Sequence, residues 1–94
     1  MIRSCRSKAA EQFFLTRKPP KEYGAIAGVA LKRLTALNAA EKLTDLLFPP
    51  GNRLEALSGD RKRQHSIRIN DQYRVCFEWR EGHAHQVEIT KHYR

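Results

Sequence analysis

The sequence has little cysteine, little acidic charge and no long apolar run. Its 94 residues include two cysteines, one tryptophan and one methionine, and only 10 acidic residues stand against 18 Lys and Arg. Cys5 and Cys76 form neither a disulfide scaffold nor a zinc pattern, so we expect reduced thiols, no metal and no cofactor. No apolar run reaches about 18 residues, and residues 1–6 lack an apolar signal core. We therefore expect no membrane association and a cytoplasmic location.

Positive charge is what the chain has in excess. Its net charge is +8 and its pI is about 10.0, while 40% hydrophobic residues are typical of a folded chain. At this length we expect one domain, residues 1–94. The excess lies in residues 1–21, with six basic residues and one acidic, and in residues 51–74, with six basic and three acidic. Such clusters predict an acidic partner, most commonly nucleic acid. The alternative is that the charge only aids solubility.

The first half of the chain has the apolar spacing of helices. Ala10, Phe13 and Phe14 recur at i, i+3 and i+4, which predicts a short helix that ends before Pro19. A second helix is expected over about 23–38, where the following apolar residues share one face: Ala27, Ala30, Leu31, Leu34 and Leu37. Leu43, Leu46 and Leu47 predict one more turn before Pro49.

The second half changes to the alternation of strands. Apolar and polar residues alternate over 66–70, 73–80 and 87–90, and Leu54 and Leu57 flank a further short strand that we expect before the turn at 58–60. Ile2 suggests a further edge strand. Helices followed by a meander of strands predict a small α+β domain, with N-terminal helices packed on an antiparallel sheet.

Matching of apolar faces predicts the hairpin registers. A three-residue loop over 70–72 joins Ile69 to Tyr73 and places Arg68 opposite Arg74 on the polar face. Two cations in direct opposition are destabilising, unless the face is solvated or a phosphate lies between them.

The next hairpin is expected to turn through residues 81–83, with Trp79 opposite an odd-numbered residue such as His85. In that register Arg74 lies near Thr90, and His92 follows one step further along the same face. The sheet would then gather basic and imidazole groups on one surface.

Such a surface suits RNA cleavage through the 2′-hydroxyl. The reaction needs a base, stabilisation of charge on the phosphate and an acid for the 5′ oxygen. Arg74 and Arg68 suit the phosphate, because a guanidinium matches it bidentately. His92 suits proton transfer because histidine titrates near neutrality, and Tyr93 and Glu55 are further candidates. Each of these residues could instead be a structural or solvated side chain.

The remaining basic residues near this surface are candidates for RNA binding: Arg53, Arg61, Lys62, Arg63 and Lys91. A solvated turn is the alternative for residues 61–63. His83 and His85 lie near one another in sequence, but no cysteine or carboxylate cluster accompanies them, so no metal site is expected.

The run from Pro49 to Arg61, continuing from Gln64 to Phe77, resembles the HigB toxins of bacterial type II toxin–antitoxin systems, within the RelE/ParE superfamily. The opening residues 1–4 and the segment 87–89 are similar to that family as well. The resemblance implies a RelE-like fold and a toxin that enters the ribosomal 30S A site and cleaves translated mRNA. It further implies neutralisation by a HigA-like helix-turn-helix antitoxin, with operator DNA bound only through the toxin–antitoxin complex.

The resemblance places the active site at Arg74, at the strand before it and at the C-terminus. Glu55 stands where several family members have histidine, and residues 91–93 read Lys-His-Tyr where many end in Asp-Tyr-His. Two other functions remain open from the sequence. One is a ParE-like toxin that inhibits DNA gyrase without nuclease chemistry, and the other is a ribosome- or RNA-binding module without catalysis.

Overall fold

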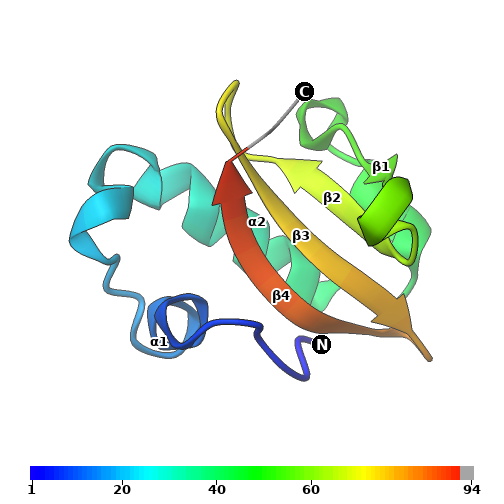
Figure 1. The fold of residues 1–94 in the computed structure, drawn as a ribbon, viewed down its shortest axis with the longest axis horizontal. Coiled ribbons are helices and arrows are strands. Elements are labelled where there is room, and N and C mark those ends of the chain that lie inside the picture. The colour runs from blue at the N-terminus through cyan, green and yellow to red at the C-terminus, as the bar shows by residue number, and fades with distance from the viewer. Residues whose placement is uncertain (92–94) are drawn as a thin grey trace.

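The structure is a computed structural model that describes residues 1–91, and it has the predicted α+β architecture. Two α-helices accompany a four-stranded antiparallel sheet in the order β1-β2-β3-β4 (Figure 1). The elements have these bounds: α1 Lys8–Thr16, α2 Ala27–Ala39, β1 Glu55–Ala56, β2 Gln64–Arg68, β3 Tyr73–Arg80 and β4 His83–Lys91. None of the described helices is long and apolar enough to cross a membrane.

The two helices begin and end where local chemistry favours it. Ser7 caps α1, because its Oγ accepts a hydrogen bond of 3.1 Å from the Ala10 amide. The helix ends at Arg17, which adopts a left-handed φ of 62°. The expected second helix is divided: η1, Lys21–Ile26, is a 3-10 segment, and α2 follows it. Glycines near this junction lower helix propensity there.

The segment between α2 and β1 contains short 3-10 turns. The predicted turn before Pro49 is η2, Leu43–Leu47, and η3, Pro50–Asn52, comes next. Asn52 is fully buried, and its Nδ2 donates to the carbonyl oxygens of Leu46 and Phe48. This side chain connects the two turns.

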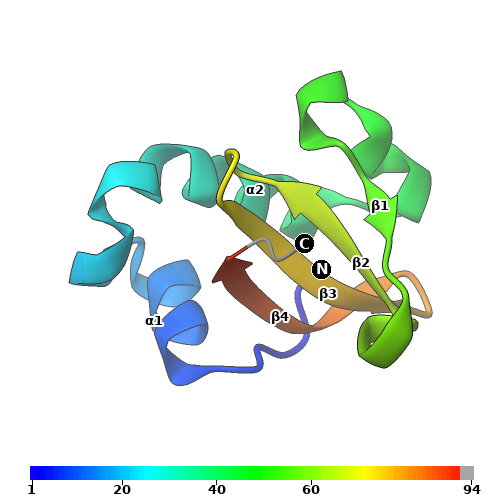
Figure 2. The ribbon, with the colours of Figure 1, turned by 45° about the horizontal axis from the view of Figure 1, so that its top comes forward.

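Helix α2 covers one face of the sheet and leaves the other face open (Figures 1 and 2). The predicted apolar face of α2 is buried at Ala30, Leu34 and Leu37. Opposite it lie the inward residues of the sheet, which include Ile67, Val75, Phe77, Val87 and Ile89. Helix α1 lies at the β4 edge and buries Phe13 in the same core. Polar side chains are thereby left to the open face of the sheet.

The register of the first hairpin is as predicted. Ile67 is opposite Val75 and Arg68 is opposite Arg74, with the turn at residues 70–72 between them. The Asn70 side chain accepts hydrogen bonds from the amides of Gln72 and Tyr73, which fixes this turn. Alternation of apolar residues was therefore sufficient to place the two arginines side by side.

The predicted pairing of Trp79 with His85 is wrong, because the second hairpin turns through two residues and not three. Trp79 is opposite Ala84, and Glu78 is opposite His85. Glu81 and Gly82 both have positive φ, 51° and 79°, as a type I′ turn requires. Such a turn matches the right-handed twist of the strands, which favours the tighter hairpin.

A β-bulge then restores the predicted alignment at the other end of the hairpin. Between the pairs Glu78–His85 and Cys76–Glu88, β4 has one more residue than β3. Gln86 adopts a φ of 54° there, and its amide donates to the Ser4 Oγ at 2.9 Å. Beyond the bulge Arg74 is opposite Thr90, as expected.

The N-terminal arm, residues 1–6, lies along the outer edge of β4. Ile2 pairs with Ala84 and Cys5 with Val87, both in parallel orientation. The expected edge strand at Ile2 is therefore present as two isolated bridges. Hydrogen bonds from the Arg3 amide to the Ala84 oxygen and from the Arg6 amide to the Val87 oxygen hold the arm in place. This pairing protects the β4 edge and brings Arg6 to the sheet.

Candidate active site

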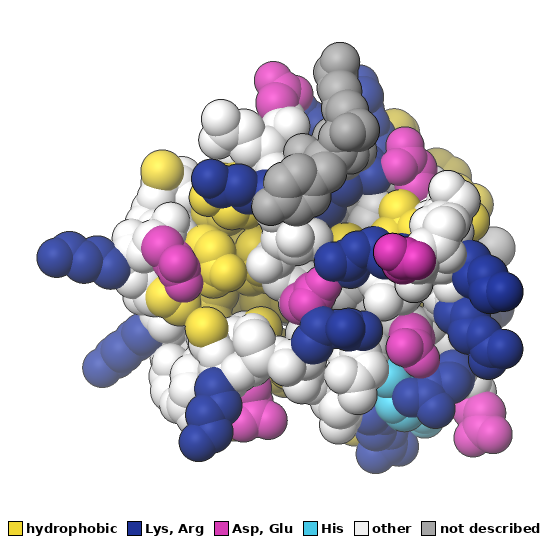
Figure 3. Space-filling model, viewed as in Figure 1, with side chains coloured by type: hydrophobic (Ala, Val, Ile, Leu, Met, Phe, Trp, Pro, Cys, Tyr) yellow, Lys and Arg dark blue, Asp and Glu magenta, His cyan; other side chains and the backbone are white. Residues whose placement is uncertain are grey.

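A pocket lies on the open face of the sheet, over β3 and the end of β4. Its volume is about 240 Å³, and it is lined by Leu57, Ser58, Arg61, Arg74, Cys76, Thr90 and Lys91. Three of these are basic residues that the sequence predicted as site residues. The same face of the molecule displays Lys and Arg side chains with several acidic ones among them (Figure 3).

Arg74 is the most deeply placed cation of this pocket, with 7% of its surface exposed. Its Nη1 donates to a carboxylate oxygen of Glu55 and, at 2.8 Å, to the Oγ of Ser66. The sheet register explains both contacts. Glu55 pairs with Ser66 across β1 and β2, and the Ser66–Cys76 pair is two residue pairs from Arg68–Arg74, which places Ser66 and Arg74 on the same face. The two contacts thus hold the Arg74 guanidinium in one position.

Arg68 lies directly opposite Arg74 but has different partners. Its guanidinium forms an ion pair with Asp71 in the β2–β3 turn, and its carbonyl oxygen accepts a 2.7 Å hydrogen bond from Arg33 Nε. Burial and the charge of Arg68 lower the pKa of Arg33. The acidic partners Asp71 and Glu55 offset the repulsion expected between the opposed arginines.

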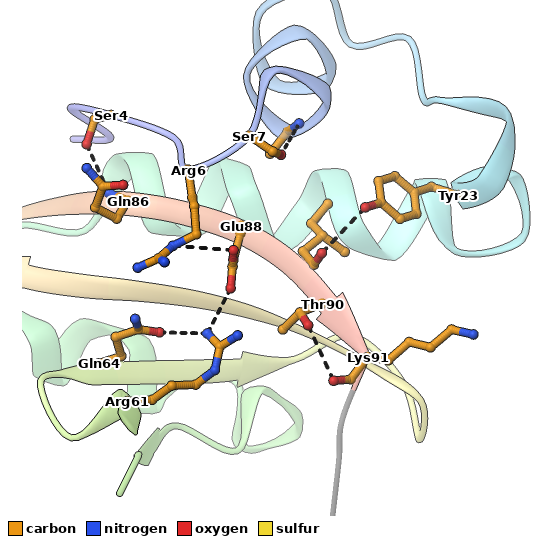
Figure 4. Close-up of polar contacts among 12 residues, drawn as sticks. Ser4, Arg6, Ser7, Tyr23, Arg61, Gln64, Gln86, Glu88, Thr90 and Lys91 are labelled. Atoms are coloured by element: carbon orange, nitrogen blue, oxygen red, sulfur yellow. Dashed lines mark hydrogen bonds and ion pairs between the residues drawn. The ribbon is translucent and has the colours of Figure 1, made fainter. Parts of the chain in front are cut away.

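Arg61 is held at the pocket wall by β2 and β4. It lies in η4, Gly59–Arg61, and its Nη1 donates to Gln64 Oε1 at 2.9 Å and Glu88 Oε1 at 2.8 Å (Figure 4). The hydrogen bond with Glu88 raises the pKa of Arg61. Arg6 contacts the other oxygen of Glu88, with Nε at 3.4 Å. Glu88 therefore joins the arm to η4 across the open face.

Cys76 lines the same pocket but has the chemistry of a buried thiol. It is 3% exposed, and this burial raises its pKa despite the neighbouring arginines. A raised pKa keeps the thiol protonated at neutral pH, so the side chain is a poor nucleophile there. Cys5 is likewise a free thiol with a pKa raised by burial.

The structure does not gather all the predicted residues at one point. Lys91 lines the pocket, whereas Lys62 and Arg63 line an adjoining hollow together with Arg61. Arg53 is exposed at the end of η3, where its φ is 44°. His92 and Tyr93 lie outside the described residues. Within residues 1–91, no group of three His, Cys, Asp or Glu side chains is arranged to hold a metal ion.

Ser66, Arg6 and Glu88 were not predicted from the sequence. Ser66 shares the alternation that places Arg68 on the polar face, so its position could have been found from the register. Arg6 and Glu88 carried no comparable signal, because their contact depends on the arm folding back along β4.

Comparisons with known proteins agree with this architecture. Residues 3–92 match the family model described as the RelE-like toxin of the type II toxin–antitoxin system HigB. Toxin HigB-1 of Vibrio cholerae is 38% identical over 88 residues, which are 93% of each chain.

Two solved structures share the fold at low sequence identity. The YoeB–YefM complex from Staphylococcus aureus aligns over 99% of both chains with a TM-score of 0.61 and 17% identity. A conserved hypothetical protein from Helicobacter pylori aligns over 98% of this chain and 96% of its own, with a TM-score of 0.52 and 15% identity. The match to the family model and the 38% identity to Toxin HigB-1 show that the chain belongs to the HigB family of RelE-like toxins of type II toxin–antitoxin systems.

Proposed function

We propose that this toxin is an endoribonuclease that cleaves mRNA on the ribosome, with Arg74 as its central catalytic residue. The observation that supports this most is the fixed guanidinium of Arg74 beneath a pocket that Arg61 and Lys91 also line. A preorganised cation at a partly enclosed site stabilises charge that develops on a phosphate in the transition state.

In the proposed reaction the 2′-hydroxyl oxygen attacks the adjacent phosphorus, and the bond from phosphorus to the 5′ oxygen breaks. Arg74 neutralises the extra negative charge of the phosphorane, and Arg68 adds to the positive potential nearby. The Glu55 carboxylate, which is next to Arg74 and half exposed, can accept the 2′ proton. We assign the proton for the leaving 5′ oxygen to His92 or Tyr93.

The basic residues around the pocket would bind the rest of the RNA. Lys91, Arg61, Lys62, Arg63 and Arg53 are assigned to phosphates of mRNA or ribosomal RNA in the 30S A site. Their contribution would weaken with salt, as counterion release requires. The matching family consists of toxins of toxin–antitoxin systems, and we propose a HigA-like helix-turn-helix antitoxin as the partner here. Operator DNA would be bound through that complex.

The test is expression of the wild type and Arg74→Ala in cells, with growth measured and mRNA cuts mapped by primer extension. We expect growth arrest and cuts within translated regions for the wild type, and neither for Arg74→Ala. Arg80→Ala is the matched control, because Arg80 lies on the same strand and its side chain is 59% exposed at the far end of it. This control should remain fully toxic.

Loss of a charged hydrogen bond costs about 1–3 kcal/mol, so Arg74→Ala could lose toxicity by unfolding. Thermal unfolding of both variants shows whether they are folded. Full toxicity of folded Arg74→Ala would show that the site is assigned wrongly. Growth arrest with intact mRNA and induced DNA-damage response would instead favour inhibition of gyrase.

A further inference from the structure

A second hollow adjoins the Arg74 pocket, and Arg61 lines both. The hollow has a volume of about 500 Å³, and its charged lining residues are Arg6, Asp60, Arg61, Lys62, Arg63 and Glu78. Four of these residues are basic and two are acidic, so the hollow favours an anion. Its walls come from segments distant in sequence, the N-terminal arm and η4.

Glu88 holds the two walls together. It projects from β4 with a side chain that is 15% exposed, and each carboxylate oxygen contacts one arginine: Oε2 meets Arg6 and Oε1 meets Arg61 (Figure 4). Without this carboxylate, the two guanidinium groups would repel one another. Each guanidinium has five N–H donors, so both keep donors beyond those used on Glu88 and Gln64.

We propose that Glu88 is a positioning residue that holds Arg6 and Arg61 as a second phosphate site. The ligand is a phosphate of single-stranded RNA next to the one that Arg74 contacts. This inference rests on the proposed function, because that function places the reactive phosphate in the Arg74 pocket. Arg61 lies between the two hollows and would contact both phosphates.

Removing the negative charge of Glu88 shows whether this residue orders the two arginines or only repels phosphate. A carboxylate beside an RNA chain repels phosphates, so Glu88→Gln would tighten binding if charge alone mattered. If Glu88 acts by ordering the two arginines, Glu88→Gln weakens binding instead. The sign of the change therefore decides between the two roles.

The experiment measures fluorescence anisotropy of a short labelled 2′-O-methyl RNA, which cannot be cleaved through the 2′ position, across a series of salt concentrations. We expect Glu88→Gln and Arg6→Ala each to weaken binding about fivefold at low salt, the size of one good exposed charge contact. Each should reduce the magnitude of the salt slope by about 0.7, the value for one phosphate contact of a single strand. A defect in folding alone would not change that slope in this way.

Two comparisons complete the test. In the Arg6→Ala/Arg61→Ala background, Glu88→Gln should no longer weaken binding. Asp60→Asn is the matched control, because Asp60 lines the same hollow and makes no ion pair with any residue in the range 1–91. Asp60→Asn should tighten binding slightly, because it removes a negative charge beside the phosphate and orders no arginine.

The inference is overturned if Glu88→Gln tightens binding as Asp60→Asn does, if Arg6→Ala has no effect, or if the wild type does not bind the RNA at low salt. The assay contains no ribosome and measures no cleavage. Intact mRNA in cells would therefore contradict the proposed function and leave these binding differences unaffected.

Discussion

Arg74 is nearly buried, and the strands around it compensate for the cost of burying a charge. An isolated buried guanidinium is strongly unfavourable, whereas one with a carboxylate and a hydroxyl partner is tolerated. Glu55 supplies the carboxylate from β1, and Ser66 supplies the hydroxyl from β2. The partners restrict the rotamers of Arg74, so the side chain would lose little further entropy on binding the phosphate that we propose for this site.

Ser66→Ala tests this arrangement at the scale of a single atom. Loss of the Oγ removes one hydrogen bond from Arg74, so we expect the free energy of unfolding to fall by about 1 kcal/mol. Because the guanidinium is then less constrained, mRNA cleavage should fall by about tenfold to a hundredfold. Urea unfolding and primer extension give the two quantities.

Ser7→Ala is the control for that measurement. It removes the cap of α1 and should cost a similar free energy of unfolding, about 1 kcal/mol, with cleavage unchanged. Equal losses of cleavage in the two serine variants would mean that stability, and not the position of Arg74, explains the effect.

At the scale of elements, the β3–β4 hairpin shows how a turn and a bulge together determine a register. The type I′ turn at Glu81 and Gly82 brings Trp79 opposite Ala84, and the bulge at Gln86 shifts the pairing by one residue. The two departures cancel, so that Arg74 still lies opposite Thr90. A simple hairpin without either feature predicts the same alignment at the site.

The turn can be tested with substitutions of opposite sign. Asparagine tolerates positive φ better than glutamate and is favoured in type I′ turns, so Glu81→Asn should stabilise the protein by a few tenths of a kcal/mol. Gly82→Ala places a Cβ at a φ of 79° and should destabilise it by about 1–2 kcal/mol. Thermal melts check both, and stabilisation by Gly82→Ala would contradict the assigned turn.

Alternation of side chains was enough to predict the sheet and the opposed pair Arg68 and Arg74. It was not enough for the two-residue turn, because Glu81 carries no sequence signal for positive φ. The sequence likewise gives no signal for the bulge at Gln86, because glycine is the residue that usually adopts a left-handed conformation. The contact of Arg6 with Glu88 required the tertiary path of the arm, which no local pattern describes.

For the whole molecule, the excess of positive charge comes from two segments, residues 1–21 and residues 51–74. Helix α2 covers one face of the sheet, and the open face displays basic side chains (Figures 1 and 3). These come from the arm, from η4 and from the strands. Several of these cations are paired with Glu55, Asp71 or Glu88. Under the proposed function, the unbalanced remainder of the +8 net charge would supply long-range attraction to RNA.

Under the proposed function, this open face cuts mRNA through the 2′-hydroxyl while the message is translated. The most direct test of this function is a reconstituted translation reaction with purified protein, in which the 5′ and 3′ ends of the mRNA fragments are identified with and without ribosomes. We predict cuts only when ribosomes translate, fragments with 5′-hydroxyl and 2′,3′-cyclic phosphate ends, and no cuts with Arg74→Ala. Intact mRNA in the complete reaction, or equal cutting by Arg74→Ala, would contradict the account.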